Sequence, residues 1–220
     1  MGQPNLASFE PATADELAAI MTWGFDHMQQ RDGGSIYLRL STRPLEQPKR
    51  AMTPDLRAEI LAGAHWIKAP SPGAELVIAY CGAVAPEARA AFEAIADDLP
   101  DAGLLAITSP DRLHAGWRDA TAARRSGTIH ALSHVERLLL PLAPNAGIVT
   151  VQDAHPAALG WLGSVHGHRC RPLGVDRFGQ AGDIASLYRE YGIDTETTID
   201  AVAEVIVSHV RETVERLAAE

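Results

Sequence analysis

Basic charge and cysteine are both scarce in this chain of 220 residues. Lysine and arginine number 19 against 28 aspartates and glutamates, for a net charge of −9. This argues against nucleic acid or an anionic membrane surface as a partner, because both require a basic footprint. The two cysteines, Cys81 and Cys170, lie far apart inside apolar stretches. We expect them to be reduced and buried, and to form neither a disulfide nor a metal site.

Long apolar runs are missing as well. No stretch reaches the ~18 uninterrupted apolar residues of a membrane helix, and the N-terminal sequence lacks the basic start and apolar core of a signal peptide. These absences predict a cytoplasmic protein with no membrane partner. With 46% hydrophobic and 21% charged residues, the composition excludes collagen, coiled coil and disorder and is typical of a globular chain.

The first 50 residues predict one helix and one strand. Thr13 and Glu16 form a T-x-x-E capping box ahead of apolar residues at helical spacing, which predicts a helix that ends near residue 30. A strand is expected over 35–41. We expect no strand before the helix, so this partial αβ unit would bury Leu17, Ile20, Met21 and its strand only against a sheet that is missing.

The stretch 42–56 is rich in proline and charge and is typical of a linker. We place a domain boundary there, which divides the chain into 1–50, the incomplete end of one domain, and 51–220, a complete one.

Strands and helices alternate through the second part. Continuous apolar strands between helices predict a mostly parallel sheet covered on both faces, which is a three-layer α/β/α fold of the α/β class. The expected strands are 75–81, 103–108, 146–152 and 170–175. The expected helices are 86–96, 110–124, 134–140, 156–165 and 183–191, followed by a long terminal helix with an apolar stripe of Ile199, Val202, Ile206, Val210, Val214 and Leu217.

Candidate sites follow the strands, because ligands of open α/β sheets usually bind beyond the carboxyl ends of the strands. The turn 82–86 lacks the glycine patterns of dinucleotide or nucleoside triphosphate loops. At Ser109 we favour capping of the next helix over anion binding. In the loop 176–183 we expect Asp183 to cap a helix and Phe178 to pack onto the core.

Histidines gather after the strand that ends at residue 152. Asp153, His155, His166 and His168 are all possible zinc ligands. However, His155 is expected at the start of a helix and the other two histidines past its far end, roughly 15 Å away. We therefore expect no metal site, and a small metal hydrolase is the least favoured alternative. No G-x-S-x-G elbow is present, which argues against a serine triad.

Six short segments are distinctive when they are taken in order. They are PNLASFEP (4–11), SIYLRLSTRP (35–44), GAVAPE (82–87), TSPDRL (108–113), DAHP (153–156) and GVDRFGQAGD (174–183). In this order they resemble the C-terminal part of the homodimeric pyruvate dehydrogenase E1 and transketolase family, from Pro4 to about Asp194. The N-terminal unit resembles the end of that family's pyrimidine-binding domain, and the remainder resembles its C-terminal domain.

The resemblance implies thiamine diphosphate and Mg²⁺ for the complete enzyme, an oxidoreductase or transferase acting on 2-oxo acids or two-carbon units. The family binds this cofactor with a G-D-G…N motif and activates it with a glutamate, and this chain has neither. We therefore expect the chain alone to bind no cofactor and to be inactive. It would be a fragment, a truncated product or a small subunit that supports dimer assembly, with a second copy or the missing N-terminal domains as partner.

No catalytic or cofactor-binding residue follows from the resemblance. Arg43 alone falls where the family's chain approaches the substrate channel, and its guanidinium could hold a carboxylate or phosphate. An ordinary surface arginine is the other interpretation. The competing function is a free-standing α/β binding or assembly domain without enzymatic activity. An in-frame upstream continuation, or a neighbouring gene that encodes G-D-G…N, would favour the enzyme.

Overall fold

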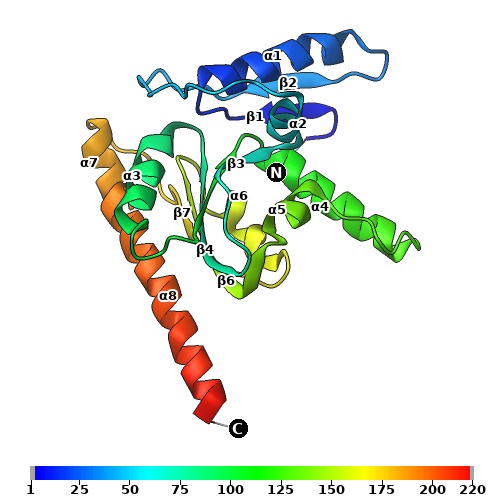
Figure 1. Ribbon diagram of the computed structural model, residues 1–220. Coiled ribbons are helices and arrows are strands. Elements are labelled where there is room, and N and C mark those ends of the chain that lie inside the picture. The colour runs from blue at the N-terminus through cyan, green and yellow to red at the C-terminus, as the bar shows by residue number, and fades with distance from the viewer. Residues whose placement is uncertain (1–2, 219–220) are drawn as a thin grey trace. The chain divides into compact units, whose positions relative to one another are not determined.

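The computed structural model describes residues 3–218 (Figure 1). The chain divides into two compact units. The first unit contains 3–65, 81–83 and 106–140, and the second contains 66–80, 84–105 and 141–218. Because both units are discontinuous in sequence, the boundary expected near residue 50 stays a prediction. Within 3–218, no helix is long and apolar enough to cross a membrane.

The first unit begins with a short βαβ motif made of β1 (Leu6–Phe9), α1 (Ala14–Gln29) and β2 (Ser35–Leu38). The two strands pair in parallel, with Leu6 opposite Ser35 and Phe9 opposite Leu38. The expectation that no strand precedes the helix is therefore wrong. At four residues, β1 is too short to show a clear alternation of apolar and polar side chains.

The capping box predicted for α1 is present, with Thr13 as the N-cap. Ile20 is completely buried and belongs to a core cluster with Phe9 and Ile60. The expectation that Ile20 needs a missing sheet is thus wrong, although Met21 is 40% exposed. Gly24 allows β2 to approach closely, since a Cβ there would lie 2.6 Å from the Ile36 Cδ1 atom.

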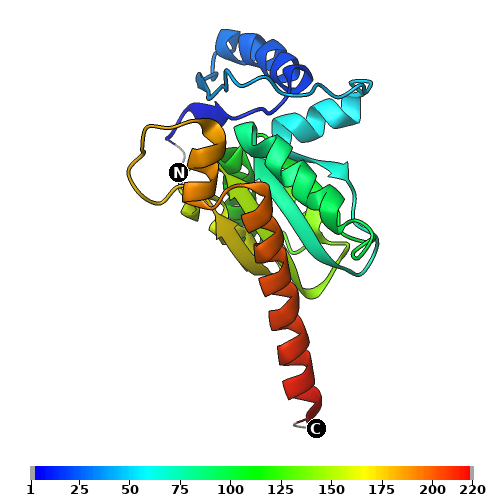
Figure 2. The ribbon, with the colours of Figure 1, turned by 90° about the vertical axis from the view of Figure 1, so that its left-hand side faces the viewer.

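The larger sheet has five strands in the order β3-β5-β4-β6-β7 and is mixed but mostly parallel (Figure 2). The expected α/β class is confirmed. Three of the four strands predicted after residue 51 match within two residues at each end, and β6 begins four residues earlier than expected. The strands are β3 (Ala64–Lys68), β4 (Ala74–Cys81), β5 (Gly103–Ile107), β6 (Leu142–Gln152) and β7 (Arg169–Leu173).

Helices belong to both units, with α4 and α5 in the first unit and α3 and α8 in the second. In the second unit α3 and α8 contact each other, and α8 covers β6. The helix expected over 156–165 is instead a single turn, α6, followed by a 3-10 turn. The remaining helices are α2 (Pro54–Ala62), α3 (Ala85–Ile95), α4 (Pro110–Arg125), α5 (His134–Leu139), α6 (Ala157–Gly160), α7 (Ile184–Tyr191) and α8 (Thr195–Ala218).

The long terminal helix is present as α8. Val202 and Val205 are buried on its sheet-facing side. Three members of the predicted stripe, Val210, Val214 and Leu217, have side chains outside the described residues.

Candidate functional site

Strand ends meet in the first unit. The backbone N–H of Glu10, just after β1, donates to the Thr108 carbonyl after β5 at 2.7 Å. The Ser109 hydroxyl donates to the Ser8 carbonyl at 2.6 Å. Ser109 also caps α4, since its Oγ accepts from the Arg112 backbone N–H at 3.2 Å. Its predicted capping role is confirmed.

An ion pair lies over the turn that follows β4. The Arg39 Nη1 atom donates to the Glu10 Oε1 atom at 2.8 Å. The turn contains Gly82 at φ +65°, where a Cβ would lie 2.5 Å from that same Glu10 oxygen. Burial, followed by the negative charge of Glu10, raises the pKa of the neighbouring Cys81 thiol well above its ordinary value. Cys81 is therefore a packing residue and a poor nucleophile.

Arg43 contacts the same turn after β4. Its Nη1 atom donates to the Ala83 carbonyl at 3.4 Å, and its backbone N–H donates to the Ser41 hydroxyl at 3.0 Å. Arg43 lines a hollow of about 210 Å³ and is the one charged residue among those that line it. Besides Arg43, the polar side chains of the lining are the hydroxyls of Thr13 and Ser41 and the amide of Gln47. The role of Arg43 as a substrate contact stays a prediction. The other lining residues are Pro11, Ala12, Thr13, Ala14, Leu17, Leu40, Ser41, Leu45 and Gln47.

A buried charge network adjoins this hollow, and local sequence patterns do not indicate it. Glu16, besides closing the capping box, accepts a hydrogen bond from the His65 Nε2 atom at 2.8 Å. Both side chains are fully buried. Arg50 reaches the network from the extended segment before α2, with its Nε atom 2.6 Å from the Asp15 Oδ2 atom and its Nη2 atom 3.4 Å from the Glu16 Oε1 atom.

Protonation in this network follows from its contacts. Burial opposes the charge of Glu16, but the hydrogen bond and charge of His65 and two backbone N–H groups outweigh burial and hold the pKa of that carboxyl below its ordinary value. An ionised carboxylate only accepts, so the His65 Nε2 atom donates. The buried Nδ1 atom of His65 has no hydrogen-bond partner among residues 3–218. Glu16 thus ties α1, the extended segment and β3 together.

Acid is expected to weaken the fold through Glu16. Because its pKa is lower in the folded state, the unfolded chain binds more protons in this range, and the free energy of unfolding must fall as the pH falls. The loss should begin near the ordinary glutamate pKa of about 4.3 and continue below it. Urea unfolding from about pH 7 to pH 3 measures this slope. Glu16→Gln should flatten it, whereas Glu46→Gln, on the exposed segment, should not. Equal slopes in all three proteins would contradict the assignment.

The three candidate histidines of the second unit, His155, His166 and His168, do not form one cluster of metal ligands. His166 and His168 are neighbours, with ring centroids 6.1 Å apart. His155 is exposed, and its Nδ1 atom accepts from the Ala157 backbone N–H at 3.2 Å. Among residues 3–218, no group of three or more His, Cys, Asp or Glu side chains could hold a metal ion. Cys170 is a free, half-buried thiol whose burial raises its pKa to about 11.

The loop before α7 corrects one prediction and confirms another. Phe178 is 92% exposed, so the expectation that it packs onto the core is wrong. The loop is held by polar contacts, since the Tyr191 hydroxyl donates to the Phe178 carbonyl at 2.9 Å and Arg177 pairs with Glu190 at 2.7 Å. Asp183 caps α7 as predicted, accepting from the Ser186 N–H at 3.0 Å.

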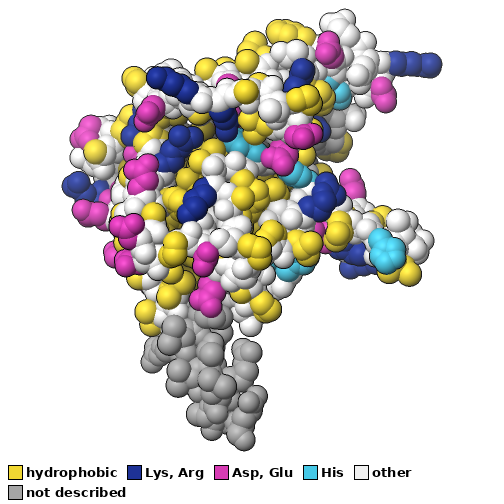
Figure 3. Space-filling model, viewed as in Figure 1, with side chains coloured by type: hydrophobic (Ala, Val, Ile, Leu, Met, Phe, Trp, Pro, Cys, Tyr) yellow, Lys and Arg dark blue, Asp and Glu magenta, His cyan; other side chains and the backbone are white. Residues whose placement is uncertain are grey.

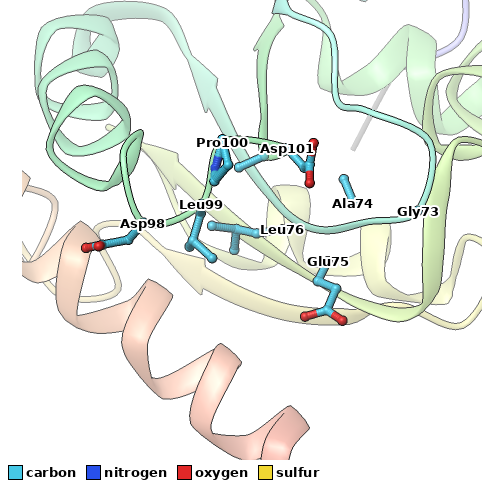
Figure 4. A pocket seen from close by; sticks show the side chains of 9 residues that line it. Gly73, Ala74, Glu75, Leu76, Asp98, Leu99, Pro100 and Asp101 are labelled. Atoms are coloured by element: carbon cyan, nitrogen blue, oxygen red, sulfur yellow. The ribbon is translucent and has the colours of Figure 1, made fainter.

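A further hollow, of about 230 Å³, lies at the opposite ends of the strands in the second unit (Figure 4). It is formed where β4 and β5 begin. Its carboxylates do not converge, because Asp98 and Glu75 point away from each other in the close-up view. On the face drawn in Figure 3, acidic and basic side chains are interspersed and form no patch of one sign. Neither the second hollow nor this surface therefore forms a cluster of like charges that would indicate a binding site.

Comparison with known proteins places the fold. A transketolase from Leishmania mexicana is 18% identical with a TM-score of 0.65, and the match covers 92% of this chain and 25% of that one. A transketolase mutant from Pichia stipitis is 17% identical with a TM-score of 0.64, covering 94% and 26%. A split-gene transketolase, described as an inactive beta4 tetramer, is 18% identical with a TM-score of 0.60, covering 93% and 59%.

No protein-family model and no curated protein matches the sequence. At these identities the structural likeness shows the fold alone. The chain has a transketolase-like fold and spans between a quarter and three fifths of the length of the transketolases that it matches.

Proposed function

We propose that this chain is the C-terminal portion, or a separate small subunit, of a thiamine diphosphate-dependent enzyme of the transketolase or pyruvate dehydrogenase E1 type. Its role is to support assembly of the enzyme, as a homodimer or with the domains that hold the cofactor, and it does not catalyse alone. The observation that carries this proposal is a transketolase-like fold over more than nine tenths of this chain that corresponds to only a quarter of a full transketolase.

The surface of the first unit supports an assembly role. At 100° per residue, Leu17, Met21, Phe25 and Met28 fall within an arc of about 80° on α1. Three of these four are more than a third exposed, with Phe25 at 58%. The two-stranded sheet beside them is below the size that is stable by itself in water. An apolar flank on a helix next to so small a sheet is the surface that a further protein element would cover.

The residues of this chain do not fit the cofactor. Mg²⁺ is held by oxygen ligands such as carboxylates, and the described residues contain no cluster of such groups. The hollow at Arg43 has one charged residue and no carboxylate. We therefore assign no catalytic step to this chain, and the cofactor belongs to the partner domains of the proposed enzyme.

A reconstitution experiment tests the proposal. Isothermal titration with thiamine diphosphate and Mg²⁺ should give no micromolar binding to the chain alone, and binding should appear when it is mixed with the polypeptide that carries the G-D-G…N motif. Phe25→Glu should prevent this association, because a charge on the apolar flank stays unpaired when it is buried. Ile129→Glu, at a 75% exposed position outside α1, is the matched control and should assemble normally.

Micromolar binding by the chain alone would overturn the proposal. A lack of association with the partner polypeptide would instead favour a free-standing binding or assembly domain, for which the exposed flank of α1 is the supporting observation. A split-gene transketolase is described as an inactive beta4 tetramer, which supports the idea of a separate subunit that assembles but does not catalyse.

A further inference from the structure

A hollow of about 400 Å³ lies beside Arg112 in the first unit. It is formed by the segment that contains β1, the end of α1 and the first turns of α4. It shares no lining residue with the hollow at Arg43. Its polar lining includes the side chains of Asn5, His27, Asp111 and Arg112.

The guanidinium of Arg112 is held in one orientation. Its Nε atom donates to the Leu61 carbonyl at 2.7 Å. Its Cζ atom lies 4.8 Å from the centroid of the Trp23 ring and 5.6 Å from that of Phe9. Trp23 is itself supported, since it stacks on His27 with ring centroids 4.6 Å apart and planes 12° apart. Two aromatic rings and one hydrogen bond therefore fix the plane of this cation before any ligand arrives.

Most of the donors of Arg112 are not used by the protein. A guanidinium has five N–H donors, and among the described residues the Leu61 carbonyl is the one acceptor that Arg112 has. No described carboxylate forms an ion pair with it. Burial lowers the pKa of Arg112, as expected for a cation that has lost solvent without gaining a counter-charge. Arg112 thus lines the hollow with a charge that no described carboxylate balances and with two Nη groups that bind no described acceptor.

We propose that this hollow is an oxyanion-binding site, in which the two Nη groups of Arg112 bind a phosphate or carboxylate. The planar fork of a guanidinium matches both groups in a bidentate way. Asp111 lines the same hollow and opposes an anion, so the site favours a ligand that also carries a hydroxyl or ammonium donor for Asp111. The proposal is independent of the proposed function, because it uses neither the α1 flank nor the partner domains.

The test is an NMR titration of the full chain with inorganic phosphate, and in parallel with acetate, at constant ionic strength. The indole N–H of Trp23 and the Nε–H of Arg112 should shift in a saturable way, and the tighter of the two anions identifies the natural group. Arg112→Gln should weaken binding by at least about tenfold, because it removes a charge-assisted bidentate contact. Asp111→Asn should strengthen binding several-fold, because it removes the opposing charge.

Arg118→Gln is the matched control, since Arg118 lies on the same helix, is exposed and does not line the hollow. It changes the net charge equally and should leave the affinity unaltered. Equal weakening by Arg112→Gln and Arg118→Gln would overturn the proposal, as would the absence of a saturable shift with both anions. Asp111→Asn leaves the aromatic stack intact. The stronger anion binding expected for this variant therefore remains a test if Arg112→Gln fails to fold.

Discussion

Replacing Glu16 by leucine is expected to lower the free energy of unfolding by about 3–5 kcal/mol. The substitution leaves the fully buried His65 with neither ring nitrogen bonded, since its Nδ1 atom already lacks a partner. It also removes one of the two carboxylates that Arg50 contacts. Urea denaturation followed by circular dichroism measures the loss.

A second capping box provides the control for this prediction. Glu136 occupies the same position in α5 as Glu16 does in α1, and its carboxylate accepts from the backbone N–H of Ser133 at 2.7 Å. Its ion-pair partner Arg124 is 31% exposed, whereas the histidine paired with Glu16 is fully buried. Glu136→Leu should therefore cost only about 1–2 kcal/mol. Equal losses would show that Glu16 acts as a cap alone.

A double substitution separates the buried pair from the cap. Replacing Glu16 by leucine and His65 by phenylalanine removes both polar partners, and such replacements are often close to neutral compared with the loss of one partner. The double variant should therefore be more stable than Glu16→Leu alone. A double variant that is less stable than Glu16→Leu would contradict a direct interaction between the two side chains.

Strands with long apolar runs could be predicted from the sequence, whereas short or irregular elements could not. Six consecutive residues of β4, from Leu76 to Cys81, are buried, and such a short continuous apolar run between turn signals is typical of a central parallel strand. The four residues of β1 carry no such pattern, and only pairing with β2 makes them a strand. The helix expected over 156–165 failed for a local reason, because Gly160 and Gly163 weaken helix formation and a 3-10 turn follows α6.

The candidate site depended on contacts that local patterns do not encode. Ser109 was identified correctly because capping depends on residues three apart. Glu16 was recognised as a cap, but its partner His65 lies 49 residues away in the sequence. A core position is expected for Phe178, but Arg177 and Tyr191 hold its loop by polar contacts and leave the ring exposed. A histidine beside a tryptophan at the start of a strand gave no indication of a buried ion pair.

Replacing Gly63 by alanine is expected to cost about 2–5 kcal/mol, the sum of backbone strain and overpacking. Gly63 ends α2 at φ +115°, where other residues are strained. A Cβ there would lie 2.7 Å from the Ser109 carbonyl oxygen and 2.9 Å from the Leu113 Cγ atom. Relief would require movement of the backbone whose N–H groups, from Thr108 and Ser109, donate to the Gly63 carbonyl. The strand ends that form the candidate site should therefore shift together with the loss of stability.

Gly127 separates the two causes within the same unit. It has a similar backbone conformation, φ +103°, but a Cβ there would meet no atom within 4 Å. Gly127→Ala should therefore cost only the strain, about 1–2 kcal/mol. The difference between the two variants in urea unfolding measures the contact between α2 and the residues that follow β5. If both substitutions cost the same, that contact adapts to an added methyl group, and the junction of strand ends is looser than its hydrogen bonds indicate.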